Sequence, residues 1–153
     1  MYRRLLSIAL LLIGACRSTE SLPCTLPADL RIRWGTWNDS LGVLDGYQLE
    51  PNGTVVRYRQ STQSATISTL DTLPVSIEST VRCSVATSLR DAFLQNQTYV
   101  VIGPLSHYVE YATATATMRA VWDARYQTYG SRHFRAIFRW LNHLIGSDES
   151  PDR

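Results

Sequence analysis

The chain has 153 residues, of which 44% are hydrophobic, and it carries a formal net charge of +2. This length is typical of a single domain, and the hydrophobic content is sufficient for a buried core, which excludes a disordered chain. Because 15 basic residues face 13 acidic ones, the charge is too balanced for a general attraction to nucleic acid, and we expect no nucleic-acid partner.

The first residues have the pattern of a secretory signal. Arg3 and Arg4 precede a short apolar run, residues 5–13, which only Ser7 interrupts. A positive start, a short apolar middle and small residues behind it are typical of such a signal. The run is far shorter than the roughly 20 residues that a membrane-spanning helix needs, so we expect no permanent transmembrane helix.

The signal ends in a specific motif, Ile13-Gly14-Ala15-Cys16, which resembles the lipobox of bacterial lipoproteins. The resemblance implies that the Cys16 thiol receives a diacylglyceryl group, that cleavage occurs just before Cys16, and that the new amine is often acylated too. A second acyl chain makes membrane attachment stable where one chain alone is marginal. The alternatives are an ordinary secretory signal with a chance cysteine, or an N-terminal signal anchor.

The same resemblance places the protein in the bacterial cell envelope, attached to the lipid bilayer through the acyl chains of Cys16. In many Gram-negative bacteria an Asp after the lipidated cysteine retains the protein in the inner membrane; here Arg17 follows, which favours the outer membrane. Removal of Arg3 and Arg4 with the signal takes the 15 basic residues to 13, equal to the 13 acidic ones. The mature protein is therefore expected to be neutral.

Four segments follow from this pattern. They are a signal peptide (1–15), a lipidated tether (16–29), one α+β domain (30–146) and a polar tail expected to be disordered (147–153). The tether is polar and contains Pro23 and Pro27, which is typical of a linker.

The first half of the domain predicts strands. Residues 30–34 alternate apolar and Arg side chains, as in a half-buried strand. Residues 43–50 and 54–60 predict a hairpin, because Asn52-Gly53 supplies the positive φ of a tight turn. Residues 65–70 predict a fourth strand, and we expect 71–74, which ends in Pro74, to break the sheet.

The second half predicts two helices and further strands. A helix capped by Ser76 or Ser79 should run to about residue 96, and 97–102 is a short strand or an extended connector. Residues 108–124 are long enough for two strands with a turn near 114–117. A last helix should start at Gly130-Ser131 and stop at Gly146. We therefore expect an α+β fold: an antiparallel sheet of five to six strands, with two amphipathic helices packed on one face.

Two cysteines remain after Cys16. Thiols outside the cytoplasm are usually oxidised, so we expect a disulfide between Cys24 and Cys83. Cys83 lies about 140° around its helix from the centre of the apolar stripe, which turns it away from the core. The bridge would close a loop of about 60 residues, worth roughly 4 kcal/mol in the chain-entropy model. The alternative is two unrelated buried thiols.

No motif for catalysis or metal binding is present. The histidines are His107, His133 and His143, and no H-E-x-x-H, C-x-x-C, G-x-S-x-G or phosphate-binding glycine loop accompanies them. His107 and Glu110 are three apart in a strand, so they should face opposite sides. We expect no enzyme activity, no cofactor and no metal.

Two groups of side chains are candidates for binding. Trp37, Tyr126 and Tyr129 lie in polar surroundings, where aromatic rings stack on sugars or on protein partners. Arg132, Arg135 and Arg139 share the side of the last helix opposite its apolar stripe, where they would contact anionic lipid, cell-wall or polysaccharide groups. The alternatives are aromatic residues of the core and its rim, and an ordinary solvated helix face.

Together these features predict a non-catalytic envelope lipoprotein that holds a protein partner on its exposed sheet face or loops. The alternative is a glycan- or cell-wall-binding module, and the second alternative is an envelope hydrolase. Beyond the lipobox, the order of strands, helix, strands and helix resembles small uncharacterised bacterial lipoproteins in architecture, which does not fix function.

Overall fold

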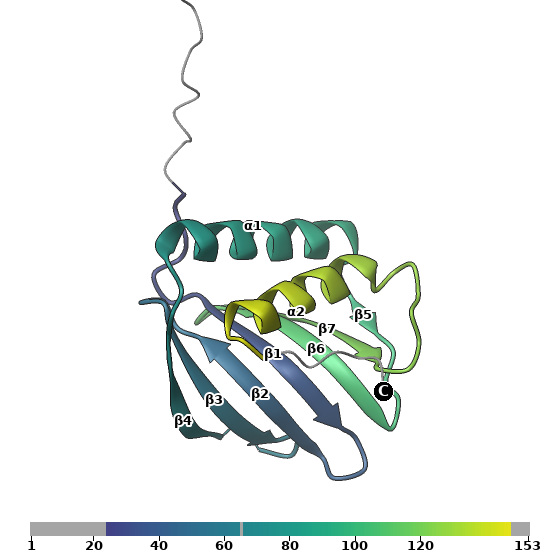
Figure 1. Ribbon diagram of the computed structural model, residues 1–153. Coiled ribbons are helices and arrows are strands. Elements are labelled where there is room, and N and C mark those ends of the chain that lie inside the picture. The colour runs from purple at the N-terminus through teal and green to yellow at the C-terminus, as the bar shows by residue number, and fades with distance from the viewer. Residues whose placement is uncertain (1–23, 65, 148–153) are drawn as a thin grey trace, which may run out of the picture.

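A twisted sheet with both helices on one of its faces forms the body of the protein (Figure 1). The computed structural model describes residues 24–64 and 66–147; the signal peptide, Cys16, Arg17 and the end of the polar tail lie outside them. The elements in chain order are β1 (Arg31–Asn38), β2 (Val43–Leu49), β3 (Thr54–Ser61), β4 (Ile67–Ser76), α1 (Ser79–Gln95), β5 (Tyr99–Val100), β6 (Leu105–Ala112), β7 (Thr117–Asp123) and α2 (Arg132–Leu144). The expected α+β class is confirmed.

The sheet is larger and more mixed than expected. It has seven strands in the order β4-β3-β2-β1-β6-β7-β5, with β1 at its centre. All neighbouring pairs are antiparallel except β5 and β7, which run parallel. The expectation of five to six antiparallel strands is therefore wrong in these details. Residues 97–102, expected to be a short strand or an extended connector, supply β5, in which only Tyr99 and Val100 pair with β7.

The predicted hairpin is confirmed at β2 and β3. The turn closes through hydrogen bonds between Glu50 and both Gly53 and Thr54. Gly53 has φ of 94°, a conformation that a side chain would strain. The Ile77 amide donates to the Gly53 carbonyl, so this turn also fixes the start of the segment that leads into α1.

The expected break at residues 71–74 is wrong, because β4 continues to Ser76. β4 is an edge strand, and its pairing with β3 shifts register twice, once between Thr69 and Asp71 and once between Thr72 and Ser76, the stretch that contains Pro74. Pro74 lacks an N–H, which a central strand could not tolerate but an edge strand with an irregular register can.

Both helices bury their apolar stripes against the same face of the sheet. The core combines Trp34 of β1, Val109 of β6 and Trp122 of β7 with side chains of α1 and α2. The helix side chains that are fully buried there are Val85, Leu89 and Phe93 of α1 and Phe134 and Leu141 of α2. The N-cap of α1 is Glu78, with no side-chain hydrogen bond, so neither expected serine caps it.

The last helix begins and ends as predicted. Ser131 is its N-cap, and Gly146 follows its end with φ of 67°, the left-handed conformation typical of glycine after a helix. One polar contact ties α2 to the centre of the sheet: the indole N–H of Trp34 donates to Asn142 Oδ1 at 2.9 Å. The turn between β6 and β7 spans 113–116, close to its expected position.

Candidate functional site

The sheet face opposite the helices is filled by its own side chains. Strand pairing places Tyr58, Gly46, Gly35 and Tyr108 in one row across β3, β2, β1 and β6. The two tyrosine side chains lie over the glycines, and their hydroxyls hydrogen-bond to each other. Both rings are fully buried, with Leu44 and other apolar neighbours around them. This half of the face is therefore a second small core.

A charged network occupies the next row of the same face. Glu110 of β6 is 0% exposed and pairs with Arg33 of β1 at 2.7 Å and with Arg119 of β7 at 2.5 Å. Arg33 also donates to the Gln48 side chain. Because a buried carboxylate is costly unless it is paired and hydrogen-bonded, this network is a structural solution to burial.

Trp37, one of the predicted binding residues, lies at the rim of this face. It is half-buried against the second core, and the Arg119 guanidinium lies 6.0 Å from its ring centroid. One ring face is therefore occupied from within the protein. Trp37 is not the exposed platform that the sequence suggested.

The histidine that lies near Glu110 in the sequence is part of the packing on the helix side of the sheet. His107 packs its ring against Trp122 and Phe138, on the helix side of the sheet. Glu110 lies on the other face, as predicted, and is held by two arginines. Within residues 24–64 and 66–147, no group of three or more His, Cys, Asp or Glu side chains is placed to hold a metal ion.

Exposed apolar side chains gather at the β5 edge of the sheet. Of the nine most exposed large hydrophobic residues in the described chain, six lie in two segments, and we call them the β5 edge surface: Val100, Val101, Ile102, Leu105, Tyr126 and Tyr129. The segments are neighbours, because the Ala124 amide donates to the Leu105 carbonyl at 3.0 Å and the hydroxyls of Tyr99 and Thr128 are hydrogen-bonded. Exposed apolar residues gathered in this way mark interaction surfaces.

Tyr126 and Tyr129 are the two exposed aromatic residues of this surface. They are 60% and 79% exposed, and each ring is covered on one side by an arginine. Arg125 lies 5.4 Å from the Tyr126 centroid, and Arg132 lies 4.3 Å from that of Tyr129. Tyrosine and arginine are enriched at the energetic centres of protein interfaces.

Val100, Val101, Ile102 and Leu105 were not among the side chains that the sequence predicted as candidates for binding. In the sequence they form a short apolar run, which is typical of a buried strand. The position of β5 at the end of the sheet order exposes Val100 and its neighbours Val101 and Ile102, whereas Leu105 lies at the start of β6, inside the sheet order.

The opposite edge of the sheet is protected. β4 carries the charged Asp71 and Pro74, and its pairing with β3 is interrupted by two register shifts. Charge, proline and irregular pairing are the usual devices that keep an edge strand from pairing with another chain. Of the two edges, the β5 edge is the one with an apolar surface.

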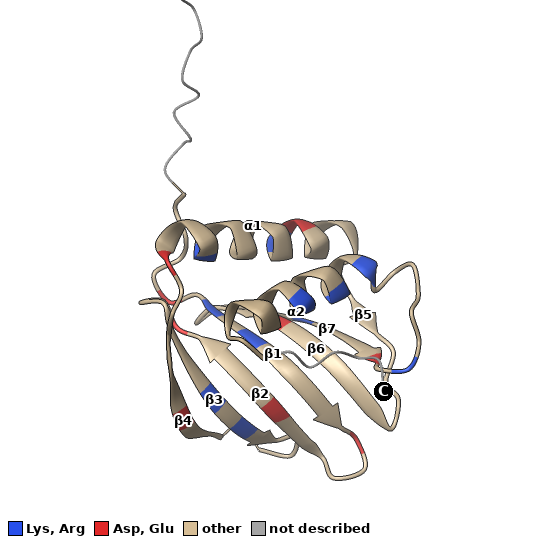
Figure 2. Cartoon of the chain, viewed as in Figure 1, with Lys and Arg blue, Asp and Glu red and all other residues tan. Residues whose placement is uncertain are grey.

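The arginines of α2 form a second exposed feature. We call Arg132, Arg135 and Arg139 the α2 basic face. Figure 2 shows these charges spaced along α2, which contains no acidic residue. Arg135 donates to the Thr128 carbonyl at 3.2 Å, while Arg132 and Arg139 are exposed. The structure therefore brings Tyr129 and Arg132 together, and it keeps Trp37 apart from both.

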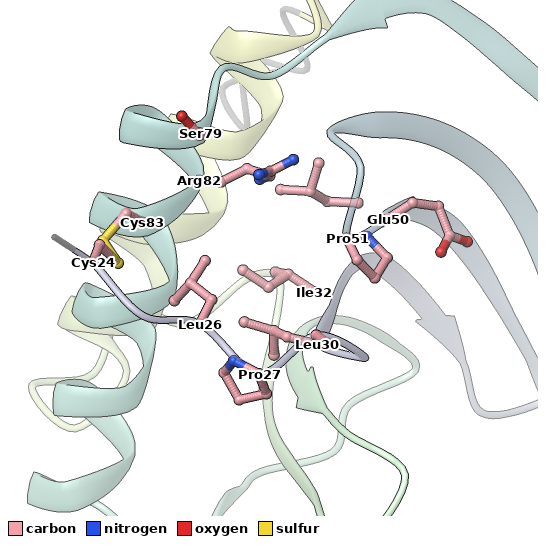
Figure 3. Close-up of a pocket in the computed structure, with 12 residues that line it drawn as sticks. Cys24, Leu26, Pro27, Leu30, Ile32, Glu50, Pro51, Ser79, Arg82 and Cys83 are labelled. Atoms are coloured by element: carbon pink, nitrogen blue, oxygen red, sulfur yellow. A yellow bond between two sulfur atoms is a disulfide. The ribbon is translucent and has the colours of Figure 1, made fainter.

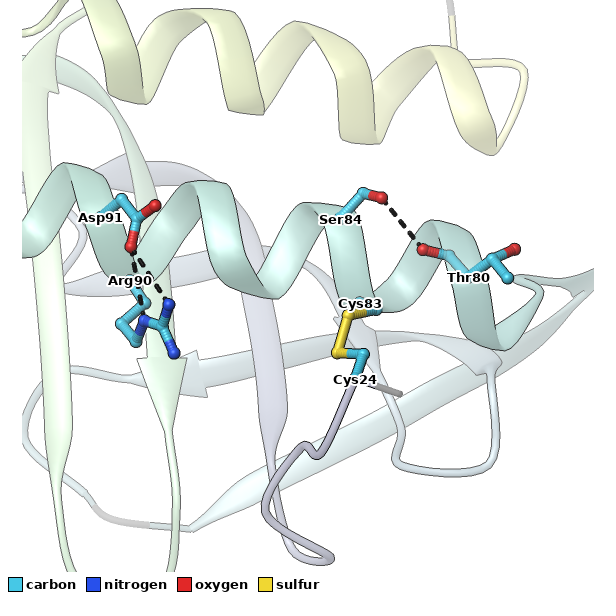
Figure 4. Close-up of a disulfide and its surroundings, with 6 residues drawn as sticks. All are labelled: Cys24, Thr80, Cys83, Ser84, Arg90 and Asp91. Carbon is cyan, nitrogen blue, oxygen red and sulfur yellow. Dashed lines mark hydrogen bonds and ion pairs between the residues drawn. A yellow bond between two sulfur atoms is a disulfide. The ribbon is translucent and has the colours of Figure 1, made fainter. Parts of the chain in front are cut away.

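The predicted disulfide is confirmed. Cys24 is bonded to Cys83 of α1, with the two Cα atoms 6.0 Å apart (Figure 4). The bridge lies on the side of α1 that faces away from α2. Leu26 packs against the core and Asp29 accepts a hydrogen bond from the Ala114 amide, so the chain is part of the body from Cys24 onward.

The bridge closes one side of a small pocket between the tether, the start of α1 and the ends of β1 and β2 (Figure 3). Its volume is about 250 Å³; Leu30, Ile32 and Leu49 supply apolar walls, and Glu50 and Arg82 are its charged residues. Typical small-molecule sites run from roughly 300 to 1,000 Å³. The pocket is too small to carry a ligand assignment.

Comparisons with known proteins add no family: no protein-family model and no curated protein matches this chain. No helix in the described ranges is both long and apolar enough to cross a bilayer.

Proposed function

We propose that this protein is a lipid-anchored, non-catalytic envelope lipoprotein that binds a partner protein through the β5 edge surface. The observation that carries the binding role is the gathering of six exposed apolar residues, two of them tyrosines, at one edge of the sheet. The sheet face opposite the helices offers a partner less exposed apolar surface, because the Tyr58–Tyr108 pair and the Glu110 network fill it.

The disulfide supports the anchored, extracytoplasmic part of the proposal. Disulfides persist in oxidising compartments and are rare in the cytoplasm. Cys24 is fixed to α1, so only eight residue steps separate the body from Cys16. Even fully extended, they span at most about 29 Å. A body on so short a connection would remain close to the bilayer surface. Arg17, the residue after Cys16, favours the outer membrane as that bilayer.

Protein binding is favoured over the alternative of glycan binding. The glycan interpretation depended on aromatic platforms, and Trp37 is half-buried with Arg119 against its ring. The aliphatic part of the β5 edge surface also suits a protein partner better than a sugar, because aliphatic side chains offer neither hydrogen bonds nor a flat stacking face.

The anchor is tested by growing cells that express the full chain with labelled palmitate. We expect label in the wild type and none in Cys16→Ser, which should also lose its firm attachment to membranes. An unlabelled wild type, or a Cys16→Ser variant that is as firmly bound as the wild type, would overturn the anchored role.

The partner is tested by photo-crosslinking in intact cells. A benzophenone amino acid at Tyr129 should give a discrete protein adduct, and the same probe at Ser68 of β4, an exposed control site, should not. Tyr126→Ala should weaken the adduct, because it removes an exposed ring of the same surface. Equal adducts at both sites, or none at Tyr129, would overturn the binding role.

A further inference from the structure

We infer that the α2 basic face binds an acidic segment of the partner protein, one whose carboxylates approach Arg132 and Arg139. This inference rests on the proposed function and deepens it, because it specifies the chemistry of the partner. The β5 edge surface would supply the apolar part of the interface, and α2 the charged part.

The distribution of ion pairs carries the inference. The described chain contains 11 arginines, and seven of them pair with Asp or Glu side chains. Of the four that form no such pair within the described ranges, three belong to α2 and the fourth is Arg82. Within the described ranges, most of the arginines that form no such pair therefore lie on one short helix.

The geometry of α2 suits an extended acidic chain. Arg132 and Arg139 lie within about 20° of each other around the helix and about 10 Å apart along it. From Ala124 to Ser147 the chain has no acidic residue, so α2 offers these guanidinium groups no internal carboxylate. Each planar guanidinium can bind a carboxylate through two parallel hydrogen bonds.

The α2 basic face is continuous with the β5 edge surface. Tyr129 belongs to that surface, and its ring stacks on Arg132 with 4.3 Å between the guanidinium carbon and the ring centroid. This contact holds Arg132 at the boundary between apolar and charged regions. A single partner segment could therefore contact both, with its apolar side chains on the edge and its carboxylates on α2.

The position of the tether favours a protein over the protein's own bilayer as the source of negative charge. Cys83, where the tether joins α1, lies about 140° around that helix from Ser88, which lines the groove between α1 and α2. The tether thus leaves from the flank of α1 that faces away from α2 (Figure 4). A bilayer that contacted this flank of α1 would lie on the opposite side from the α2 arginines.

The test uses the full lipidated chain in phosphatidylcholine nanodiscs and a fluorescein-labelled octaglutamate peptide as probe. We expect binding, measured by fluorescence anisotropy, to weaken about tenfold in the double variant Arg132→Gln/Arg139→Gln. The matched control Arg57→Gln/Arg59→Gln removes the same charge from exposed arginines that pair with Asp45. It should change binding less than about twofold. An octaglutamine peptide should not bind.

Four results would overturn the inference. Octaglutamate fails to bind the wild type, or both double variants lose binding equally. Alternatively, phosphatidylglycerol in the nanodiscs slows hydrogen exchange across α2 in the wild type only, which would reassign the arginines to the bilayer. A Tyr129 crosslink that persists unchanged in Arg132→Gln/Arg139→Gln would also reject the acidic partner while leaving the proposed function intact.

Discussion

The hydroxyl groups of Tyr58 and Tyr108 meet across two intervening strands. They can do so because the residues between them in the row, Gly46 and Gly35, have no side chains. The contact joins residues 50 positions apart and closes the sheet face that no helix covers. Four predictions about stability follow from this face and from the disulfide.

Gly46→Ala should destabilise the fold by about 1–3 kcal/mol, the usual cost of overpacking. A Cβ on Gly46 would lie 2.1 Å from the Trp34 carbonyl oxygen and 2.8 Å from the Tyr108 hydroxyl. Urea unfolding of the wild type and the variant measures the difference. Ser68→Ala, on the exposed edge strand β4, is the control and should be neutral. If Gly46→Ala is as stable as this control, the tyrosine pair does not depend on the absence of a side chain at Gly46.

The tyrosine pair should make stability fall in alkali. Burial raises the pKa of Tyr58 from 10.0 to about 12 and raises the pKa of Tyr108 well above its ordinary value. The unfolded chain therefore loses these protons first as pH rises. The contribution of the neutral hydroxyls to folding is complete below pH 10 and is lost above it, by about 3 kcal/mol for Tyr58 by pH 12.

Unfolding measurements on the Tyr58→Phe variant at several pH values test this loss of stability in alkali. Near neutral pH the variant should be less stable than the wild type by about 1 kcal/mol, from the lost hydrogen bond. This difference in the free energy of unfolding should fall to zero and then change sign as the pH rises above 10. Tyr126→Phe, which alters an exposed ring, should follow the wild type throughout. Parallel curves for Tyr58→Phe and the wild type would contradict the predicted titration.

Glu110→Gln should lower the free energy of unfolding by about 3 kcal/mol, because it leaves Arg33 and Arg119 without a charged partner in a largely buried setting. Asp45→Asn is the matched control. This variant also removes a carboxylate that lies between two arginines. Because Arg57 and Arg59 are half-exposed, the free energy of unfolding should fall by less than about 1 kcal/mol. If chemical denaturation shows equal losses of stability in the two variants, burial does not determine how much the Glu110 network contributes to stability.

Loss of the disulfide should lower the free energy of unfolding by about 4 kcal/mol, since the bridge spans 59 positions. Cys24→Ser/Cys83→Ser and the chemically reduced wild type should share the same lower urea midpoint. Thiol quantification confirms reduction in the second case. An unchanged midpoint in a fully reduced sample would mean that the bridge does not restrict the unfolded chain.

Local patterns were sufficient to predict several elements. The Asn52-Gly53 turn, the alternation around Trp34 and the stripe that contains Phe134 and Phe138 each reflect short-range rules. The disulfide could be predicted because Cys83 lies off the apolar stripe of its helix, where a packing role for the thiol is excluded.

What could not be predicted depends on partners far apart in the sequence. Nothing local marks Glu110 as buried, since its two arginines come from β1 and β7. Residues 97–102 were expected to be a short strand or a connector, and only the parallel pairing of β5 with β7 places Val100 at an exposed edge of the sheet. Pro74 indicated a break because its strand could not be identified as an edge strand.

The Cys24–Cys83 bridge also determines how the body responds to being pulled. The chain enters β1, the middle strand, only seven residues after Cys24. Force applied on the N-terminal side of Cys24 reaches the covalent bond to α1 first, and tension is diverted into a helix before it can peel β1 away from β2 and β6. Once the bond is reduced, the same load falls directly on the centre of the sheet, so mechanical toughness would exist only in the oxidised form.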